Sequence, residues 1–528
     1  MRKISWMITV LILLYAVRLA TIAWLELAPD EAYYWYWAKH LDWSYYDHPP
    51  MVAYIMALFT GLGGNSEFFV RIGGLLSSLL VIGLIYLSCR RLSPEDRDVP
   101  WEVTFVANIT LLFAAGCIIQ TPDTPLLLFW TLAVYCGIRI ITGGSASWWY
   151  LWGIALGLGL LSKYTMILIV PCQFAFLLLA RDHRHWLFTK EPYLALLTGL
   201  IVFSPVLIWN WQYDWVSFAF QFGRGFAPTD KPVFTKLAEY LGGQAGIITP
   251  LLFLAFLYYS VKAFQDVMKR GAPEYLYLLL LSWPILLFFA FSSIRGGVAQ
   301  PNWPAPAYIA GLLLLGLVYS RAYREKRSHR IYLHVAVGLA LLANVAIHVH
   351  LFKPYLPISP KIDTTQQFHG WRQLGQTINR TIQENPHPSG YFLLADRGTT
   401  VAGALFYTAK PYIGIDFSKP ERYIFLQKLE ELKGKNAMIL LHHVNDQDLQ
   451  IYKRYFRELQ VIGKHTAFFR GVPIEEYSVY LVLGKDYQGN WQPYQSEAGI
   501  HTLKTNWIPA GTGTTIYFFY TSHGLKNG

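Results

Sequence analysis

The sequence predicts a polytopic α-helical membrane protein that ends in a soluble α/β domain, and three observations support this fold class. Hydrophobic residues make up 54% of the 528 residues and charged residues only 15%, and the apolar residues form long continuous runs. Basic residues collect in the short loops between these runs. Beyond about residue 355 the apolar runs become shorter and alternate with polar segments, as strands and helices of a soluble domain do.

About eleven apolar segments are long enough to cross a bilayer core, which requires roughly 20 residues. They lie near 4–25, 68–89, 101–119, 122–141, 147–162, 163–180, 192–210, 245–264, 274–293, 303–319 and 331–350. Two of these spans meet at Ser162 and Lys163 with almost no loop between them. Because Arg2 and Lys3 precede the first run and no small-residue cleavage site follows it, we expect a retained first helix.

The net charge of +11 is explained by orientation in a membrane rather than by a nucleic-acid partner. With the N-terminus in the cytoplasm, most basic residues fall in loops on the inner side, and few fall on the outer side. This bias predicts that the loop after the first span and the C-terminal domain face outward from the cytoplasmic membrane. The chain contains no Walker loop, which argues against an ATP-driven pump.

Two further segments are predicted to be juxtamembrane helices at the outer interface. The segment 49–62 is too short to span and begins with two prolines, which suit a helix start. The outer loop 211–244 is rich in aromatic residues around Arg224. The transmembrane domain is expected over 1–350 and the exported domain over 351–528.

The exported domain is predicted to contain three strands and three helices. The strands are expected at 391–396, 437–443 and 476–484, and the helices near 366–383, 421–433 and 446–456. No cysteine follows Cys172, so no disulfide framework is expected there.

Two acidic pairs flank the aromatic stretch between the first span and the double proline. Asp30 and Glu31 could take a proton from an attacking hydroxyl, or they could be ordinary first-turn acids of a helix. Asp47 stands beside His48, which can be a cation, a proton carrier or a metal ligand, although Asp47 could also simply cap a helix. Tyr33 belongs to a set of rings that suits lipid headgroups or a sugar.

Other candidates lie in the outer loops or within a span. Asp123, in the sequence TPDTP, could orient an acceptor or cap a helix. Lys163 and Arg224 could neutralise a phosphate, while Lys163 could instead anchor a helical hairpin. Arg18 lies within the first span, where it could extend to the outer surface or pair with an acid or a phosphate.

The motifs DEAYYWYWAKHLDWSYYDHPPMVAY, TPDTPLLLFWTLAVY, SKYTMILIVP and QPNWPAPAYIA resemble the bacterial branch of the protein mannosyltransferase and aminoarabinose transferase superfamily. Its members are membrane glycosyltransferases with the GT-C fold, and the likeness covers about residues 1–350. They transfer a sugar, with inversion, from a polyprenyl-phosphate donor to an acceptor on the non-cytoplasmic side.

The resemblance implies roles for several residues. Asp30 matches the catalytic carboxylate and Glu31 its neighbour, and Asp123 resembles a second acid of the same cavity. Asp47 matches an acid that helps to hold a zinc ion, and His48 stands where a lysine contacts the donor phosphate. Arg224 lies in the loop that supplies a phosphate-binding arginine.

The expected function is therefore transfer of a sugar from a polyprenyl-phosphate donor to a lipid, glycan or protein acceptor. In this hypothesis Asp30 is the base, and Arg224 and Lys163, with His48 or Arg18, hold the phosphate. The alternatives are a flippase or transporter for lipid-linked oligosaccharides, and a ligase or polymerase with a glycan acceptor. Neither sugar nor acceptor is identified by the sequence.

Overall fold

The computed structural model describes residues 2–225, 231–296, 300–360, 362–419, 421–424 and 429–489. The chain forms two compact units. The first, here called the helical unit, comprises Met1–Ala23, His48–Val52 and Arg71–Lys353. The second, the mixed unit, comprises Trp24–Asp47, Ala53–Val70 and Pro354–Gly528. The mixed unit therefore joins two N-terminal segments to the C-terminal α/β region.

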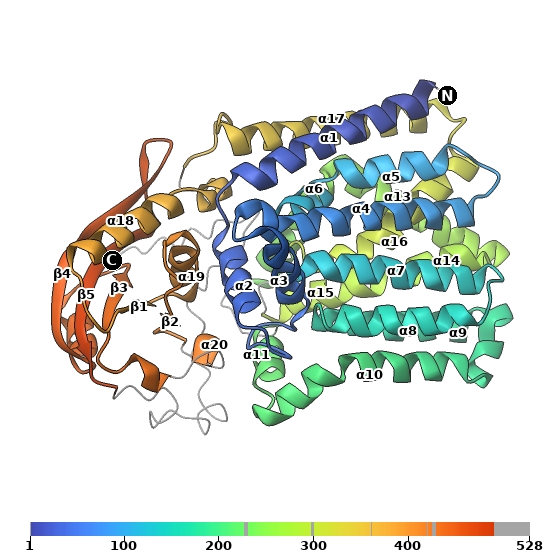
Figure 1. The fold of residues 1–528 in the computed structure, drawn as a ribbon. Helices are drawn as coiled ribbons and strands as arrows, with labels where there is room; N and C mark the ends of the chain where they lie inside the picture. The colour runs from blue at the N-terminus through green and yellow to red at the C-terminus, as the bar shows by residue number, and fades with distance from the viewer. Residues whose placement is uncertain are drawn as a thin grey trace. The chain divides into compact units, whose positions relative to one another are not determined.

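Long helices running along a common direction make up the helical unit (Figure 1). Its elements are α1 (Arg2–Trp24), α4 (Glu67–Leu92), α5 (Val99–Ile109), α6 (Leu111–Ile118), α7 (Asp123–Ile141), α8 (Ser147–Leu160), η1 (Tyr164–Leu168), α9 (Ile169–Leu179), η2 (Arg181–Phe188), α10 (Glu191–Gln212), α11 (Val216–Gly225), α12 (Val233–Ile248), α13 (Pro250–Arg270), α14 (Pro273–Leu280), α15 (Trp283–Arg295), α16 (Ala305–Ala322) and α17 (Arg327–Phe352).

The predicted count of eleven spans is not confirmed. Among the described residues, eight helices are long and apolar enough to cross a membrane, and up to ten if each of two bent pairs is one span. The segment predicted at 101–119 is broken into α5 and α6, which are bent by 67°. The turn predicted at Ser162 is present, but α8 before it has only 14 residues.

Small residues allow the helices to approach closely. A Cβ added to Gly153 on α8 would lie 2.3 Å from the carbonyl oxygen of Ala195 on α10. Such a contact is impossible for any larger residue without separating the two helices. α16 is the most deeply enclosed long apolar helix in the described part of the chain, with 78% of its 18 residues buried.

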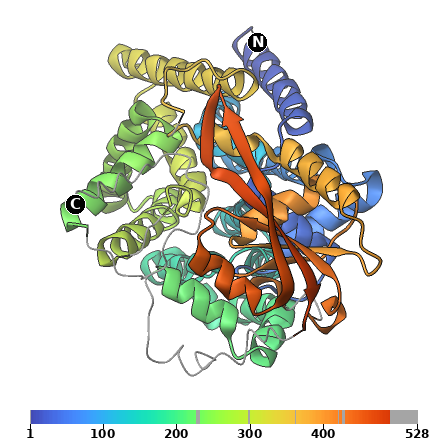
Figure 2. The same ribbon diagram turned by 90° about the vertical axis from the view of Figure 1, so that its left-hand side faces the viewer.

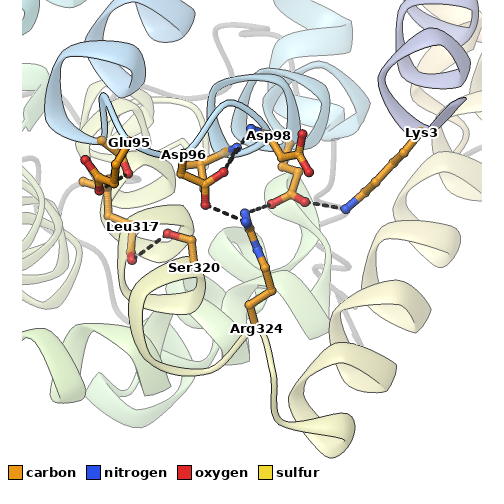
Figure 3. Close-up of polar contacts among 10 residues, drawn as sticks. Lys3, Glu95, Asp96, Asp98, Leu317, Ser320 and Arg324 are labelled. Atoms are coloured by element: carbon orange, nitrogen blue, oxygen red, sulfur yellow. Dashed lines mark hydrogen bonds and ion pairs between the residues drawn. The ribbon is translucent and has the colours of Figure 1, made fainter. Parts of the chain in front are cut away.

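An ion-pair network connects helix ends at one end of the helical unit (Figure 3). Arg324, in the turn after α16, pairs with Asp96 and, at 2.8 Å, with Glu102 on α5. Lys3, at the start of α1, also pairs with Glu102. The network therefore joins three separate segments where they leave the apolar part of the chain.

The mixed unit combines helices that precede and follow the spans with one sheet. Its elements are α2 (Pro29–Lys39), most of α3 (Met51–Gly63), η3 (Thr364–Phe368), α18 (Trp371–Glu384), β1 (Tyr391–Ala395), α19 (Gly398–Tyr407), β2 (Gly414–Asp416), α20 (Glu421–Ile424), η4 (Leu429–Leu432), β3 (Asn436–Leu441), α21 (Asp446–Lys453), β4 (Phe456–Phe469) and β5 (Val472–Tyr487). The helix predicted at 49–62 is thus confirmed as α3, while its place at the membrane interface stays a prediction.

The sheet has the order β2-β1-β3-β5-β4. Strands β2, β1 and β3 are parallel, and β5 is antiparallel to both β3 and β4. Every residue of β1 and β3 is buried, as expected for strands covered on both faces. The long β4–β5 hairpin is prominent in Figure 2.

The three predicted strands are confirmed as β1, β3 and β5, and the helices predicted near 366–383 and 446–456 as α18 and α21. The helix predicted at 421–433 is represented by α20 and η4, and its middle, 425–428, lies outside the described residues. The sequence analysis missed α19, β2 and β4. β4 lacks a simple alternation of burial because its register with β5 shifts twice.

Candidate active site

An acid–base pair lies at the start of α7 in the helical unit. Asp123 is in the first turn of this helix. Its Oδ1 accepts a hydrogen bond from Nζ of Lys163 at 2.7 Å, and its Oδ2 accepts one from Nδ2 of Asn302 at 3.0 Å. The Lys163 side chain is 9% exposed and that of Asp123 17%. Lys163 is thus an ion-pair partner of Asp123. The sequence analysis considered Lys163 as a phosphate ligand or as the anchor of a helical hairpin, and it did not predict this contact.

Further contacts bring the double-proline segment to the same place. The backbone N–H of Met51 donates to the carbonyl oxygen of Leu161, two residues before Lys163, at 3.0 Å. His48 is buried, and its Nδ1 lies 3.4 Å from Nε2 of Gln221 on α11. His48 therefore contacts the neutral side-chain amide of Gln221.

Arg224 extends the same cluster. It lies at the end of α11, and its guanidinium is 5.6 Å from the ring centre of Trp303, the residue after Asn302. This is the distance of a cation–π contact. The helical unit thus brings together His48, Asp123, Lys163 and Arg224, which we name the cation cluster because it contains the basic side chains of Lys163 and Arg224.

Sequence reasoning missed the contributions of Asn302 and Trp303. Both lie in the QPNWP segment between α15 and α16, and Asn302 binds Asp123 directly. A polar residue and a tryptophan between two prolines at the end of a span were the available signal. Without tertiary contacts, nothing assigned them to Asp123 and Arg224.

Arg18 is fully buried within α1. Its Nη2 donates to the carbonyl oxygen of Asn108 at 2.6 Å, and its Nη1 to the Oδ1 of the same residue at 3.2 Å. Asn108 lies next to the break between α5 and α6, where backbone carbonyls lose their helical partners. The described contacts of Arg18 are thus those of a helix-break partner, and its predicted phosphate contact stays a prediction.

The first acidic pair lies in the first turn of α2, in the mixed unit. Pro29 begins this helix, and Glu31 is fully buried. The Oε2 of Glu31 accepts a hydrogen bond from the backbone N–H of Ala28 at 3.0 Å, which is the reciprocal half of a capping box. Asp30 is partly exposed. The two neighbouring carboxylates therefore differ in access to a substrate.

The second acid, Asp47, lies beside an arginine of the α/β region. Its Oδ2 is 3.5 Å from Nε of Arg422 on α20, and the Arg422 guanidinium is 5.9 Å from the ring centre of Tyr33. Nη1 of Arg422 is 3.9 Å from Oδ2 of Asp416 at the end of β2. We call these four residues the Arg422 cluster. Sequence reasoning missed Arg422 because almost four hundred residues separate it from Asp47.

Burial and charge shift the pKa values in this cluster. Burial by itself lowers the pKa of Arg422, but the charges of Asp47 and Asp416 raise it above its ordinary value overall. Burial raises the pKa of Tyr33, and the nearby Asp47 carboxylate raises it further. Arg422 is therefore a permanent cation and Tyr33 a neutral phenol at any physiological pH.

The residues around Asp47 do not fit the predicted zinc ion. No group of three or more His, Cys, Asp and Glu side chains suited to a metal occurs among the described residues. The neighbour of Asp47 is the guanidinium of Arg422, which supplies the positive charge that a metal ion would otherwise supply at that carboxylate. The zinc ion therefore stays a prediction that this arrangement of side chains does not support.

A family model described as dolichyl-phosphate-mannose-protein mannosyltransferase matches residues 47–209. The chain is 26% identical over 398 residues to a lipid A galacturonosyltransferase of Rhizobium johnstonii, covering 72% of this chain and 77% of that protein. It is 24% identical over 366 residues to the undecaprenyl phosphate-alpha-4-amino-4-deoxy-L-arabinose arabinosyl transferase of Edwardsiella ictaluri, covering 66% of this chain and 62% of that protein.

The fold also matches a solved structure. The crystal structure of ArnT from Cupriavidus metallidurans bound to undecaprenyl phosphate superimposes with a TM-score of 0.62 at 15% identity, covering 90% of this chain and 98% of that one. At this identity the match establishes a common fold. It extends well beyond the segment that the family model covers.

Proposed function

We propose that this chain, a membrane glycosyltransferase of the GT-C type, transfers a sugar from a polyprenyl-phosphate donor to a lipid acceptor at the outer face of the cytoplasmic membrane. The observation that carries this proposal is the similarity, over 72% of the chain, to a protein that is named for transfer of galacturonic acid to lipid A. The arabinosyl transferases, named for an undecaprenyl-phosphate-linked sugar, support the donor class. Lipid A is thus the favoured acceptor, ahead of an envelope glycan or a protein.

The chemistry is a single displacement at the anomeric carbon. The acceptor oxygen forms a bond to this carbon while the bond to the phosphate oxygen breaks, so the configuration inverts. The acceptor proton must be removed as the new bond forms, and the polyprenyl phosphate leaves with one more negative charge than it had in the donor. The enzyme therefore needs a base and a set of cations.

We assign the base to Asp30. Glu31 accepts a backbone hydrogen bond within its own helix turn and is fully buried, so its carboxylate is already used in capping α2. Asp30 is partly exposed at the start of the same helix, where a substrate hydroxyl can reach it. This difference supports Asp30 over Glu31 for proton removal.

We assign the leaving phosphate to the cation cluster. Arg224 carries a planar guanidinium suited to phosphate oxygens, and Lys163 lies in the same cluster through Asp123. A phosphate that enters the cluster would compete with Asp123 for Lys163. Truncating one such cation typically costs about 2–4 kcal/mol in the transition state.

A purified-enzyme assay tests the proposal. The full-length protein in liposomes is supplied with undecaprenyl-phosphate-linked galacturonic acid or aminoarabinose and with lipid A, and the product is measured by mass spectrometry. We expect sugar-modified lipid A from the wild-type protein and a fall in turnover of about 10²-fold or more for Asp30→Asn. Glu325→Gln, a change at an exposed acid between α16 and α17, is the matched control and should be silent.

The same assay separates transfer from transport. A flippase would move the labelled donor across the liposome membrane without forming a new glycosidic bond, and Asp30→Asn would leave that movement intact. Absence of covalent product with every donor and acceptor pair, together with movement of the donor, would overturn the proposal in favour of the flippase.

A further inference from the structure

The α/β region is fixed to the N-terminal segments of the mixed unit by two acids. Oε2 of Glu26 accepts a hydrogen bond from the backbone N–H of Trp371 at 2.8 Å, at the first residue of α18. Oε1 of Glu67 pairs with Arg372 at 2.6 Å and accepts a hydrogen bond from Tyr407 at 3.1 Å. These contacts hold the two ends of the segment that contains α2 and α3.

Aromatic contacts hold α2 itself. Trp35 makes an edge-on contact with Phe406 on α19, with ring centres 4.9 Å apart. The ring centres of Tyr33 and Tyr36 lie 5.5 and 5.4 Å, respectively, from the ring centre of Tyr423 on α20. The helix that carries Asp30 is therefore packed on the C-terminal α/β region within this unit.

The Arg422 cluster lies where these contacts meet the Asp47 end of the segment. Oδ1 of Asp416 accepts hydrogen bonds from the backbone N–H groups of Ser418 and Lys419 at 3.0 and 3.1 Å, so this carboxylate is rigidly held at the end of β2. Arg422 stands between it and Asp47. One guanidinium thus connects the edge of the sheet to Asp47 and, through Tyr33, to the helix of Asp30.

Stability alone does not explain a cation at this position. The two ion-pair distances, 3.5 and 3.9 Å, are longer than hydrogen bonds. Oδ2 of Asp416 and Nε of Arg422 are buried without a hydrogen-bond partner among the described residues, and removing such groups from water costs free energy. Apolar side chains of similar size would hold the segments together as well, but they would not fix the direction of a carboxylate.

We propose that the C-terminal α/β region is a working part of the transferase, and that Arg422 is a positioning residue that holds Asp47 and the Asp30-bearing helix α2 in the geometry of the reaction. This inference rests on the proposed function. It gives the α/β region a role in turnover beyond that of an appended domain. It also explains why the chain places an arginine six residues beyond a rigid strand end.

The test compares Arg422→Gln with Arg380→Gln, a control at an exposed arginine on α18 of the same region. In full-length protein, we expect Arg422→Gln to lower kcat at least tenfold per folded molecule while KM for the lipid donor changes less than twofold. The variant Arg422→Lys should recover part of the lost kcat. Asp47→Asn should lower kcat no further when it is combined with Arg422→Gln.

Hydrogen exchange of the same proteins provides a readout that needs no substrate. Backbone amides of residues 40–47 should exchange at least tenfold faster in Arg422→Gln than in Arg380→Gln, with no change in β1 and β3. If the amides of residues 40–47 exchange at the same rate in Arg422→Gln and Arg380→Gln, the inference is overturned, and this result does not depend on which sugar donor the enzyme uses. If the wild type transfers sugar and Arg422→Gln has the same kcat, the inference is also overturned. If the wild type transfers no sugar, the proposed function is overturned instead. If Arg422→Gln fails to fold, Arg422→Lys is decisive, and wild-type kcat with wild-type exchange contradicts the inference.

Discussion

Replacing Lys163 by methionine should destabilise the helical unit, because it leaves the Asp123 carboxylate without its cation. Two unit charges 2.7 Å apart attract each other by about 6 kcal/mol at an effective dielectric constant of about 20. Desolvation of both groups offsets much of this attraction. The side chains are 9% and 17% exposed, so we expect a loss near the lower end of the range for a broken buried pair, about 3 kcal/mol.

A double-mutant cycle measures the pair itself. Asp123→Asn keeps an acceptor for Asn302 and removes the charge, so combining it with Lys163→Met should restore about 2 kcal/mol of the summed losses. The free energy of unfolding is measured on purified protein in mixed micelles titrated with a denaturing detergent. Losses that simply add, with a coupling below about 0.5 kcal/mol, would refute a direct ion pair.

A matched control separates burial from distance. Lys231 and Glu239 in the same unit are also 2.7 Å apart, but their side chains are 42% and 25% exposed. Lys231→Met should therefore cost less than about 1 kcal/mol. Equal losses at the two sites would show that burial of the Asp123–Lys163 pair is not what makes it strong.

Three other substitutions and one topology test complete the predictions. Arg224→Ala should weaken binding of the lipid-phosphate donor, measured by titration, while the unfolding midpoint stays within the error of the wild type; unchanged affinity would make Arg224 only an anchor on Trp303. Arg324→Gln removes two ion pairs (Figure 3) and should lower the free energy of unfolding by about 1–2 kcal/mol without changing turnover per folded molecule. Burial raises the pKa of Glu26 above its ordinary 4.5, so the folded state binds that proton more tightly and stability falls as pH rises between the unfolded and folded pKa values; Glu26→Gln should flatten this part of the stability curve. A reporter fused after Leu356 should be active only outside the cytoplasm and one near Ser328 only inside, and the reverse pattern would contradict the predicted export of the C-terminal domain.

The helical architecture was predictable because long apolar runs have few alternatives in a bilayer. Most of the predicted spans contain one long helix or a closely spaced pair of helices. The count of spans was not predictable, because hydropathy does not report bends. The break at Thr110 depends on buried partners for the carbonyls it releases, such as Arg18 on Asn108, and these partners lie on other helices.

Strands were predictable where both faces are buried, as in β1 and β3, because such strands are continuous apolar runs. β4 was missed because its exposed residues dominate its pattern, and β2 because three residues are too few for any periodicity. α19 was missed although its residues are apolar, because a run of ten residues after a short strand suits either element.

The sequence by itself determined the chemistry that the chain can offer: acids and cations in loops that flank apolar spans, within motifs that resemble a known transferase family. Only the tertiary structure decided which of these groups meet. Lys163 faces Asp123, Glu31 faces its own helix end, and Arg422 reaches Asp47 from the far part of the chain. The physical reason is that the interaction energy of a charged side chain depends on its distance from other charges and on its exposure to water. A linear sequence fixes neither the distance nor the exposure for residues hundreds of positions apart.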